Sequence, residues 1–274
     1  MKRKLIFLDI DGTLTPAGTN VPPPSAVAAI HDAQANGHLV FLCTGRNVAM
    51  LSPLLHYGFD GMVASAGGYV LCCGHILYDC PMTPQQYETA LAALHAGGVF
   101  CTVETRDATY GDTDLAAFLA QTDGGNSEIE RWRKALAAQL NIRPLTEYDG
   151  SPVYKIVFMC REESQLAAAR RASEQDFAFC VQEVAAHGCL NGELMNRRFD
   201  KGRGVLRICE ALGASPADAI GFGDSTNDLE MMHVVGTSVC MENGSPSVKA
   251  VSTLVCPAVE ADGLAWAFHR LGLC

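Results

Sequence analysis

The sequence predicts an α/β fold, in which a doubly wound parallel sheet is interrupted by an inserted α+β domain. Two observations predict it. Short apolar segments alternate with helical segments in the first part of the chain and again after about residue 190. Between these parts the alternation is lost, and strands and helices follow in another order. We therefore expect a Rossmann-like core from residues 1–81 and 189–274, and an inserted unit at residues 82–188.

The first part of the core is expected to hold three buried strands, because short apolar runs end there at polar residues or glycine. These strands are Lys4–Leu8, His38–Cys43 and Gly61–Ser65. A helix is predicted from the proline-rich start at Pro22 to Asn36, where Gly37 stops it, and a second helix over Asn47–Tyr57. The segment Val70–Asp79 is predicted to be a hairpin that turns at Gly74.

The inserted unit is expected to mix helices and strands around an irregular polar patch that ends near Asn126. Its predicted elements are the helix Gln85–Ala96, the strand Val99–Glu104, two further helical stretches after the patch, the strand Val153–Cys160, the helix Ser164–Gln175 and the strand Phe177–Val184. The parallel pattern then resumes. Its predicted elements are the helix Lys201–Leu212, the strand Ala219–Phe222, a helix near Leu229, the strand Ser238–Met241 and the helix Leu264–Leu271.

Composition restricts the possible partners of the chain. The formal charge of −10 over 274 residues argues against a broad nucleic-acid surface and against an anionic membrane partner. The twelve cysteines form no C-x-x-C pair and mostly lie in apolar runs, which favours a reducing compartment. The first apolar run is broken by Asp9, and no segment is long enough to span a membrane. We expect a cytoplasmic protein.

Two carboxylates directly follow the first strand, in the segment Asp9-Ile10-Asp11. The carboxyl ends of parallel strands form the edge at which such sheets bind ligands. Residues two apart in an extended chain share a face, so both acids can address one ligand. Their mutual repulsion is costly unless a cation or a shared proton lies between them. A surface pair that caps a turn is the simpler alternative for these residues taken alone.

A second acidic segment, residues 223–228 (Gly-Asp-Ser-Thr-Asn-Asp), follows the strand that ends at Phe222. It offers two carboxylates and an amide at a strand-to-helix turn, which are ligands that a hard cation such as Mg²⁺ prefers. Helix capping would explain the serine, the threonine and Asp228. It would not explain Asp224 or Asn227, which are therefore the better candidates for ligands.

Two further segments could hold an anion. Thr44-Gly45-Arg46 ends the second strand and offers a hydroxyl and a glycine N–H, although Thr44 could be a plain helix cap. Lys201 starts a predicted helix, where a cation is poorly placed unless an anion is near. Acids that gather a divalent cation, with Thr44, Gly45 and Lys201 to neutralise an anion, are the equipment of phosphoryl transfer.

These segments resemble, in order and over essentially the whole chain, the four motifs of the haloacid dehalogenase superfamily of phosphatases. The matching residues are Asp9-x-Asp11-Gly12-Thr13, Thr44-Gly45-Arg46, Lys201-Gly202 and Gly223-Asp224-x-x-Asn227-Asp228. Within the superfamily the chain resembles the Cof-type branch (type IIB), whose large α/β cap is inserted between the second and third motifs. The unit at residues 82–188 falls where that branch carries its cap, which implies that it sets substrate specificity.

The resemblance implies a role for each matching residue. Asp9 would attack phosphorus to form an aspartyl-phosphate, and Asp11 would act as general acid and then as general base. The implied ligands of Mg²⁺ are Asp9, Asp11 through its backbone carbonyl, Asp224, Asn227 and Asp228. The implied phosphate-binding residues are Thr44, Gly45, Arg46, Lys201 and Asn227, of which Thr44 and Lys201 also count as catalytic.

The function expected from this resemblance is a Mg²⁺-dependent phosphatase for small phosphorylated metabolites, such as sugar phosphates. Two alternatives stay open: a phosphomutase of the same fold and a non-catalytic phosphometabolite sensor. The chain departs from the branch at Ala66-Gly67-Gly68, where Asn-Gly-Ala is usual, and at Glu242, where glycine is usual. Residue type alone suggests Arg106, Tyr110 and Tyr154 as specificity residues of the cap. The substrate and the oligomeric state stay open.

Overall fold

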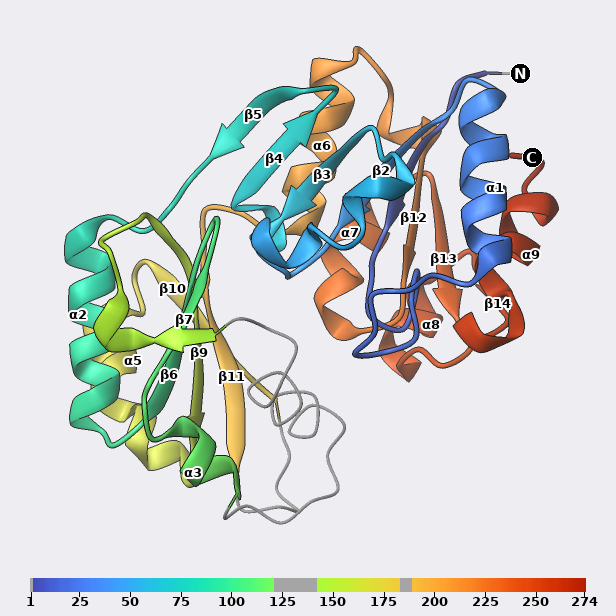
Figure 1. Cartoon of the computed structure of the whole chain (residues 1–274). Helices are drawn as coiled ribbons and strands as arrows, with labels where there is room; N and C mark the ends of the chain where they lie inside the picture. The colour runs from blue at the N-terminus through green and yellow to red at the C-terminus, as the bar shows by residue number, and fades with distance from the viewer. Residues whose placement is uncertain (1, 121–141, 183–188) are drawn as a thin grey trace. The chain divides into compact units, whose positions relative to one another are not determined.

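The computed structural model of the chain describes residues 2–120, 142–182 and 189–274, and it contains two compact units. The first unit comprises Met1–Arg46, Leu51–Asp79 and Phe199–Cys274, and the second comprises Asn47–Met50 and Cys80–Arg198 (Figure 1). None of the helices in the described residues is long and apolar enough to cross a lipid bilayer.

The first unit is built on an eight-stranded sheet with the order β14-β13-β12-β1-β2-β3-β4-β5. Its strands are β1 (Leu5–Leu8), β2 (Leu39–Cys43), β3 (Gly61–Ala64), β4 (Tyr69–Cys72), β5 (His75–Asp79), β12 (Ala219–Gly223), β13 (Thr237–Met241) and β14 (Leu254–Cys256). The strands from β14 to β3 pair in parallel, whereas β4 and β5 pair antiparallel at one edge. The sheet therefore joins the first and last parts of the chain.

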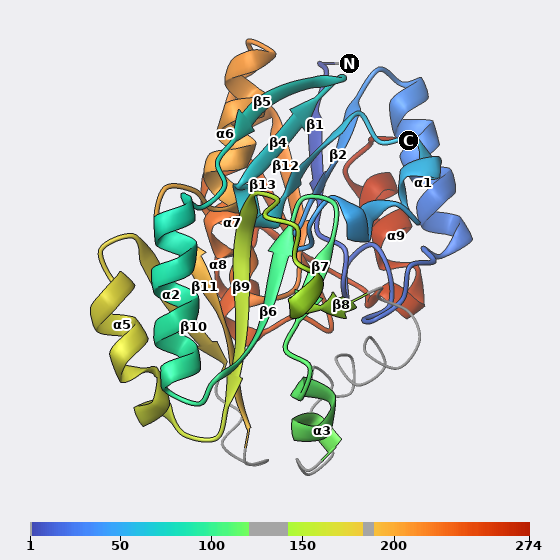
Figure 2. The same ribbon diagram turned by 60° about the vertical axis from the view of Figure 1, so that its left-hand side comes forward.

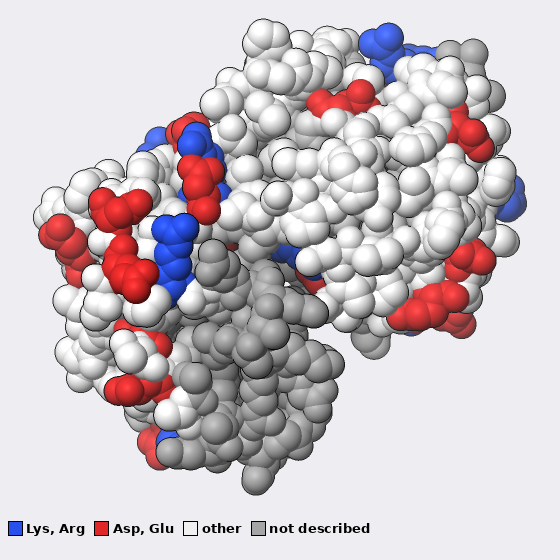
Figure 3. All heavy atoms as spheres, in the orientation of Figure 1, with Lys and Arg blue, Asp and Glu red and all other residues white. Residues whose placement is uncertain are grey.

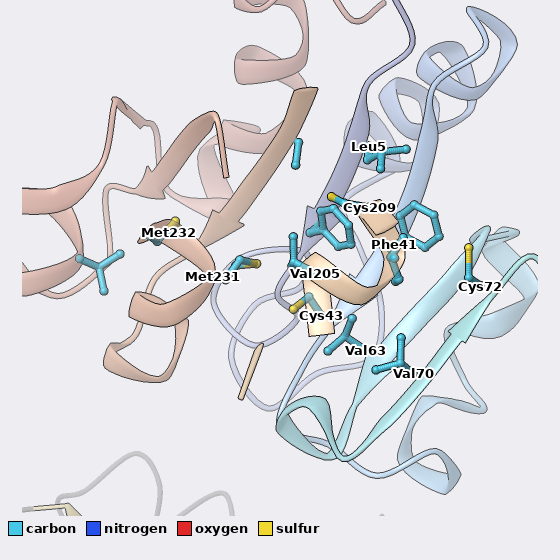
Figure 4. Packing of buried hydrophobic residues seen from close by; sticks show 14 of the residues in the cluster. Leu5, Phe41, Cys43, Val63, Val70, Cys72, Val205, Cys209, Met231 and Met232 are labelled. Atoms are coloured by element: carbon cyan, nitrogen blue, oxygen red, sulfur yellow. The ribbon is translucent and has the colours of Figure 1, made fainter. Parts of the chain in front are cut away.

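Helices cover both faces of this sheet, so it is doubly wound as expected (Figure 2). On one face lie α1 (Pro24–Ala35) and α9 (Gly263–Arg270), and the ring of Phe268 packs on Phe222 of β12 with centroids 5.3 Å apart. On the other face lie α6 (Lys201–Ala211), α7 (Leu229–Val234) and α8 (Pro246–Val251). There Leu5, Phe41, Val205 and Met231 belong to one buried hydrophobic cluster (Figure 4). Because both faces are covered, the central strands are apolar throughout.

The register of the parallel strands fixes which residues meet at the edge of the sheet. Leu8, the last residue of β1, pairs with Leu42 of β2 and with Phe222 of β12. The residues that follow these three strands therefore leave the sheet at the same level. This register brings the segments after Leu8, Cys43 and Gly223 together, although they are distant in the sequence.

The second unit contains a six-stranded sheet with the order β10-β11-β9-β6-β7-β8. Its strands are β6 (Phe100–Thr105), β7 (Thr109–Gly111), β8 (Ile142–Pro144), β9 (Val153–Cys160), β10 (Phe177–Gln182) and β11 (Leu190–Asn196). The helices α2 (Pro84–Ala96) and α5 (Ala167–Ser173) pack on one face, where Leu94 and Leu166 join a core with Phe158. A further helix, α3 (Leu115–Ala120), follows β7.

Two predicted elements of the sequence analysis are wrong. The helix expected over Asn47–Tyr57 is absent, and short 3₁₀ turns at Ala49–Leu51 and Leu55–Tyr57 take its place. Pro53 lacks an N–H and its ring clashes with the preceding helical turn, so a continuous helix cannot form across it. The patch expected to be irregular as far as Asn126 contains β7 and α3.

The end of the second unit also differs from the expected boundary at residues 188 and 189. The strand β11 pairs with β10 and β9, so its residues belong to the second sheet and the unit extends to Arg198. The two helical stretches expected after Asn126 fall largely outside the described residues, where a strand, β8, starts at Ile142. The last residues of the strand expected over Phe177–Val184 also lie outside them.

The first turn of α6 packs tightly, and this packing positions Lys201. A Cβ atom at Gly202 would lie 2.4 Å from the backbone oxygen of Glu230, and one at Gly204 would lie 2.4 Å from Val63 Cγ1. The side chain of Asp200 caps the helix by accepting the N–H of Arg203 at 2.7 Å. The glycines thus allow the helix to approach α7 and β3 closely.

We predict that Gly202→Ala lowers the free energy of unfolding by about 1–3 kcal/mol, because a backbone oxygen cannot move aside as a flexible side chain can. Chemical denaturation measures this change. Glu210→Ala, an exposed position on the same helix, is the control and should change stability by at most about 0.5 kcal/mol. Higher stability in Gly202→Ala, as helix propensity alone would give, would contradict the close packing.

Candidate active site

Asp9 lies at the carboxyl end of β1, in the middle of the parallel sheet. Its backbone N–H donates to the carbonyl oxygen of Phe222 at 3.0 Å, which continues the pairing of β1 with β12. Its side chain is almost completely buried, and Oδ1 accepts a hydrogen bond from Lys201 Nζ at 2.7 Å. The first carboxylate of the sequence motif is therefore held at a fixed place by backbone pairing.

Lys201, the first residue of α6, is the cation at the centre of this site. Its side chain is 1% exposed, and its ammonium group donates to Asp9 Oδ1 at 2.7 Å, to Asp228 Oδ1 at 2.6 Å and to Asn227 Oδ1 at 3.2 Å. Burial alone would lower the pKa of Lys201, but the charges of Asp228 and Asp9 raise it. The ammonium group therefore stays protonated inside the protein.

The turn after β12 holds Asp228 and Asn227 in place. Asp228 is fully buried, and its Oδ2 accepts the backbone N–H groups of Asp224 at 3.0 Å and Ser225 at 3.1 Å. Oδ1 of Asn227 accepts a hydrogen bond from the hydroxyl of Ser225 at 2.8 Å. Capping and charge pairing therefore act together here, because the carboxylate that closes the turn also pairs with Lys201.

Three carboxylates lie close enough to share one cation. Oxygens of Asp9, Asp224 and Asp228 are all within 4.8 Å of one another. Burial and then the charge of Asp228 raise the pKa of Asp224 to about 6, and the same two causes raise that of Asp9. Hard oxygen donors that crowd together against their own repulsion fit a divalent cation such as Mg²⁺.

The backbone at Gly12 makes room for Asp224. Gly12 has φ of +81°, and a Cβ atom there would lie 2.4 Å from Asp224 Oδ2. Any other residue would push the carboxylate of Asp224 away from the other two acids. The glycine of the first motif is therefore needed both for the turn and for the carboxylate that belongs to the last motif.

Two residues around Asp224 were missed in the sequence analysis. Nδ2 of Asn243 donates to the carbonyl oxygen of Gly12 at 2.8 Å and lies 3.4 Å from Asp224 Oδ2, and the hydroxyl of Thr13 donates to Asp224 Oδ1 at 3.4 Å. Asn243 follows β13, so the rule that ligand-binding groups follow parallel strands could have found it. Its neighbour Glu242, the position that departs from the branch, has an exposed side chain.

Asp11 and Arg46 contact each other. Nε and Nη2 of Arg46 donate to the two carboxylate oxygens of Asp11 at 2.9 and 2.7 Å, and Nη1 donates to Asn20 Oδ1 at 2.6 Å. This two-pronged geometry is the strongest form of a carboxylate–guanidinium pair. Arg46 was expected to bind phosphate, and the structure shows that its guanidinium group holds Asp11.

Thr44 is buried between two strands, directly after β2. Its backbone N–H donates to the carbonyl oxygen of Val63 at 2.8 Å, and its hydroxyl oxygen accepts the N–H of Arg46 at 3.1 Å, across Gly45. The hydroxyl therefore closes a turn with Arg46 and caps no helix, since short 3₁₀ turns replace the helix that was expected to follow. The role of Thr44 and Gly45 in binding phosphate stays a prediction.

The residues suggested for specificity all belong to the second unit. Tyr110 and Tyr154 are buried within it, and the ring of Tyr110 packs edge-on against Tyr148. Arg106 is partly exposed and pairs with its neighbour Asp107 at 2.7 Å. Packing explains the burial of the two tyrosines, and the role of the three residues in specificity stays a prediction.

Comparison with known proteins places these motifs in a family. The profile of the haloacid dehalogenase-like hydrolases matches residues 6–268 of the chain. Among curated proteins, the presumed phosphatase YkrA of Bacillus subtilis is 27% identical over 280 residues, which cover 100% of this chain and 99% of YkrA. The 5-amino-6-(5-phospho-D-ribitylamino)uracil phosphatase YwtE of the same organism is 25% identical and covers 98% of each chain.

Solved structures have the same fold. A protein of Geobacillus kaustophilus is 26% identical and superposes with a TM-score of 0.80, covering 99% of this chain and 100% of its own. The subclass IIB sugar phosphatase BT4131, at 22% identity, has a TM-score of 0.77 with coverage of 99% and 100%. The inserted unit is therefore part of a fold that is shared from end to end.

We predict that Lys201→Met lowers the stability of the metal-free protein by about 3–5 kcal/mol, because it leaves Asp9 and Asp228 buried without their cation. Chemical denaturation measures the loss. Lys2→Met, at a largely exposed ion pair with Asp218, is the control and should cost at most about 1 kcal/mol.

A divalent cation bound at the same carboxylates should return part of the stability lost in Lys201→Met, about 2.7 kcal/mol at a hundredfold excess over its dissociation constant. Adding Asp228→Asn to Lys201→Met should cost less than the sum of the two single changes, since the two residues share one contact. Strict additivity would argue against a coupled charge cluster.

Proposed function

This chain belongs to the haloacid dehalogenase-like hydrolase family, and from this premise we propose that it hydrolyses small phosphorylated metabolites with Mg²⁺ through an aspartyl-phosphate. The chain is a phosphoric monoester hydrolase, as the full-length matches to proteins named as phosphatases indicate. One observation carries the finer proposal: a buried lysine lies 2.7 Å from Asp9 inside a cluster of three carboxylates. Such a cluster offers a nucleophile, a cation site and a fixed positive charge at one point.

The residues present fit a magnesium ion. Asp9, Asp224 and Asp228 supply hard carboxylate oxygens within 4.8 Å of one another, and the backbone carbonyl of Asp11 is the further ligand that we propose. Asn227 belongs to the same turn and would hold the surrounding shell. When bound, the ion would neutralise charge on the phosphoryl oxygens and keep carboxylates ionised.

We propose that a carboxylate oxygen of Asp9 attacks phosphorus, so that a bond forms to the carboxylate and the bond to the leaving oxygen breaks. The backbone pairing of Asp9 fixes the direction of attack. Lys201, which donates to Asp9 in the structure, then donates to a phosphoryl oxygen instead. The hydroxyl of Thr44 and the N–H of Gly45 are the further donors. A water molecule attacks the phosphorus of the intermediate, which releases phosphate and restores the carboxylate.

Asp11 is the proposed proton carrier, and Arg46 is the residue that positions it. Asp11 would protonate the leaving oxygen and then take a proton from the attacking water. The paired hydrogen bonds from Arg46, at 2.9 and 2.7 Å, fix the plane of the carboxylate. The ion pair favours the carboxylate form, so Asp11 must leave Arg46 at least in part to carry a proton.

The substrate class is proposed from the relatives and from the architecture. The names of YwtE and of the HMP-PP phosphatase of Yersinia enterocolitica, which is 25% identical over 253 residues, describe phosphates of small metabolites. We propose a substrate of that size, with sugar phosphates included, and the second unit as the part that selects it. A phosphomutase would differ in its product, and a sensor would bind without turnover.

The surface supports a small soluble substrate rather than a nucleic acid. The formal charge is −10, and Figure 3 shows acidic and basic side chains interspersed, with no continuous basic surface among the described residues of that face. The cysteines are free thiols and most are buried, which supports our placement of the protein in a reducing compartment, the cytoplasm.

We predict that Asp9→Asn reduces phosphate release by a factor on the order of 10³ or more, because the amide cannot attack phosphorus. EDTA should abolish the activity of the unchanged protein, and Mg²⁺ should restore it. A screen of small phosphate esters, in which released phosphate and isomerised esters are both measured, checks the effect of the mutation and of EDTA. Asp32→Asn, an exposed aspartate, is the control. Undiminished turnover by Asp9→Asn, or isomerised esters without phosphate, would refute the hydrolytic mechanism.

We predict that Arg46→Lys lowers kcat by up to roughly a hundredfold and changes KM little, because lysine keeps the charge but cannot hold both oxygens of Asp11. Steady-state kinetics on the best substrate of the screen measures both constants. Arg203→Lys on α6, at a largely exposed position, is the control. A higher KM with unchanged kcat would show instead that Arg46 binds phosphate, as the sequence motif suggested.

A further inference from the structure

The loop after β3 contains a buried hydroxyl that the mechanism above does not use. Ser65 is 2% exposed, and its Oγ has no hydrogen-bond partner in the described part of the chain. Buried hydroxyl groups are almost always hydrogen-bonded, because leaving one unpaired costs free energy. An unpaired hydroxyl at this depth therefore calls for a ligand that the protein itself does not supply.

The backbone of this loop is held in an unfavourable conformation. Ser65 and Ala66 have φ of +48° and +55°, and Gly67 follows with +102°. Residues with side chains rarely adopt such angles, and they persist only where surrounding contacts enforce them. Two hydrogen bonds do so here: the N–H of Ser65 donates to the carbonyl oxygen of Arg46 at 2.8 Å, and that of Ala66 donates to Thr44 at 2.9 Å.

The other side of the loop contacts the segment that carries Lys201. A Cβ atom at Gly67 would lie 2.3 Å from the backbone oxygen of Asp200, and one at Gly68 would lie 2.9 Å from the ring of Phe199. The loop is therefore packed between Thr44–Arg46 on one side and the start of α6 on the other. These are the two segments that bind the phosphate in the proposed function.

Three amide groups of this loop are already used within the protein. The N–H groups of Ser65 and Ala66 donate to carbonyl oxygens of the preceding segment, and that of Gly68 donates to the carbonyl oxygen of Ser65 at 3.1 Å. Ala66 carries no polar side chain. Of the side chains at residues 65–68, that of Ser65 is therefore the one that can donate to a ligand.

We propose that the hydroxyl of Ser65 donates a hydrogen bond to a phosphoryl oxygen of the substrate, beside Thr44 and Lys201. The ligand class is a phosphate monoester dianion or inorganic phosphate. The inference rests on the proposed function, since it assigns one more donor to the same phosphate site. The strained backbone holds the hydroxyl at this place before the ligand arrives.

The test is Ser65→Ala, with inorganic phosphate in the presence of Mg²⁺ as the probe in calorimetry. Loss of a hydrogen bond to a charged group should weaken phosphate binding roughly tenfold or more. The melting temperature should stay the same or rise, because a methyl group replaces an unpaired buried hydroxyl. Ser65→Gly removes the hydroxyl and also relieves the backbone strain, because glycine adopts a positive φ freely. It should weaken phosphate binding to a similar extent.

Ser238→Ala is the matched control within the same unit. Ser238 is equally buried, but its hydroxyl is 3.4 Å from the carbonyl oxygen of Val251 and 3.2 Å from Thr253 Oγ1. This change should lower the melting temperature and leave phosphate affinity unchanged. The opposite responses of the two serines separate a ligand-binding role from a structural one.

Each outcome is decisive. Equal phosphate affinity in the unchanged protein and in Ser65→Ala overturns the assignment of Ser65 and leaves the proposed function intact. A loss of stability in Ser65→Ala with intact phosphate affinity overturns it too, since the hydroxyl would then have a partner inside the protein. An unchanged protein that neither binds phosphate nor releases it from esters refutes the proposed function and this inference with it.

Discussion

The buried contact between Lys201 and the carboxylates of Asp9 and Asp228 is the interaction on which the rest of the site depends. Three acids gather within 4.8 Å of one another, an arrangement whose repulsion would oppose folding without a cation. Lys201 supplies one positive charge from the start of α6, at 2.7 and 2.6 Å from two of the acids. One charge does not balance three. The site therefore keeps a deficit of positive charge that a divalent ion can fill.

The gathering of these charged groups depends on the parallel sheet of the first unit. Asp9 follows β1 and Asp224 follows β12, and the pairing of these neighbours places both acids at one edge. Lys201 reaches the same edge because Gly202 and Gly204 let α6 approach α7 and β3. The charge cluster thus depends on strand register and on helix packing together. A shift in either would separate groups that are far apart in the sequence.

Much of this arrangement could be predicted from the sequence, because strands and their ends leave local signals. The apolar runs before Asp9 and Asp224 identified two strands, which the structure shows to be neighbours, and the rule for parallel sheets placed both acids at one edge. Asn243 follows the same rule, yet nothing in its own segment distinguished it from an ordinary loop residue. The ion pair of Asp11 with Arg46 left no such signal, since it depends on side-chain directions across a distance of 35 residues.

The boundaries of the second unit were harder to predict for a related reason. Residues 192–196 alternate between buried and half-buried positions, as a strand of either sheet could, but their partners β9 and β10 decide to which sheet they belong. Pairing of this kind is a tertiary property that the strand alone does not encode. The helix expected over Asn47–Tyr57 does not form because Pro53, a local breaker visible in the sequence, interrupts it.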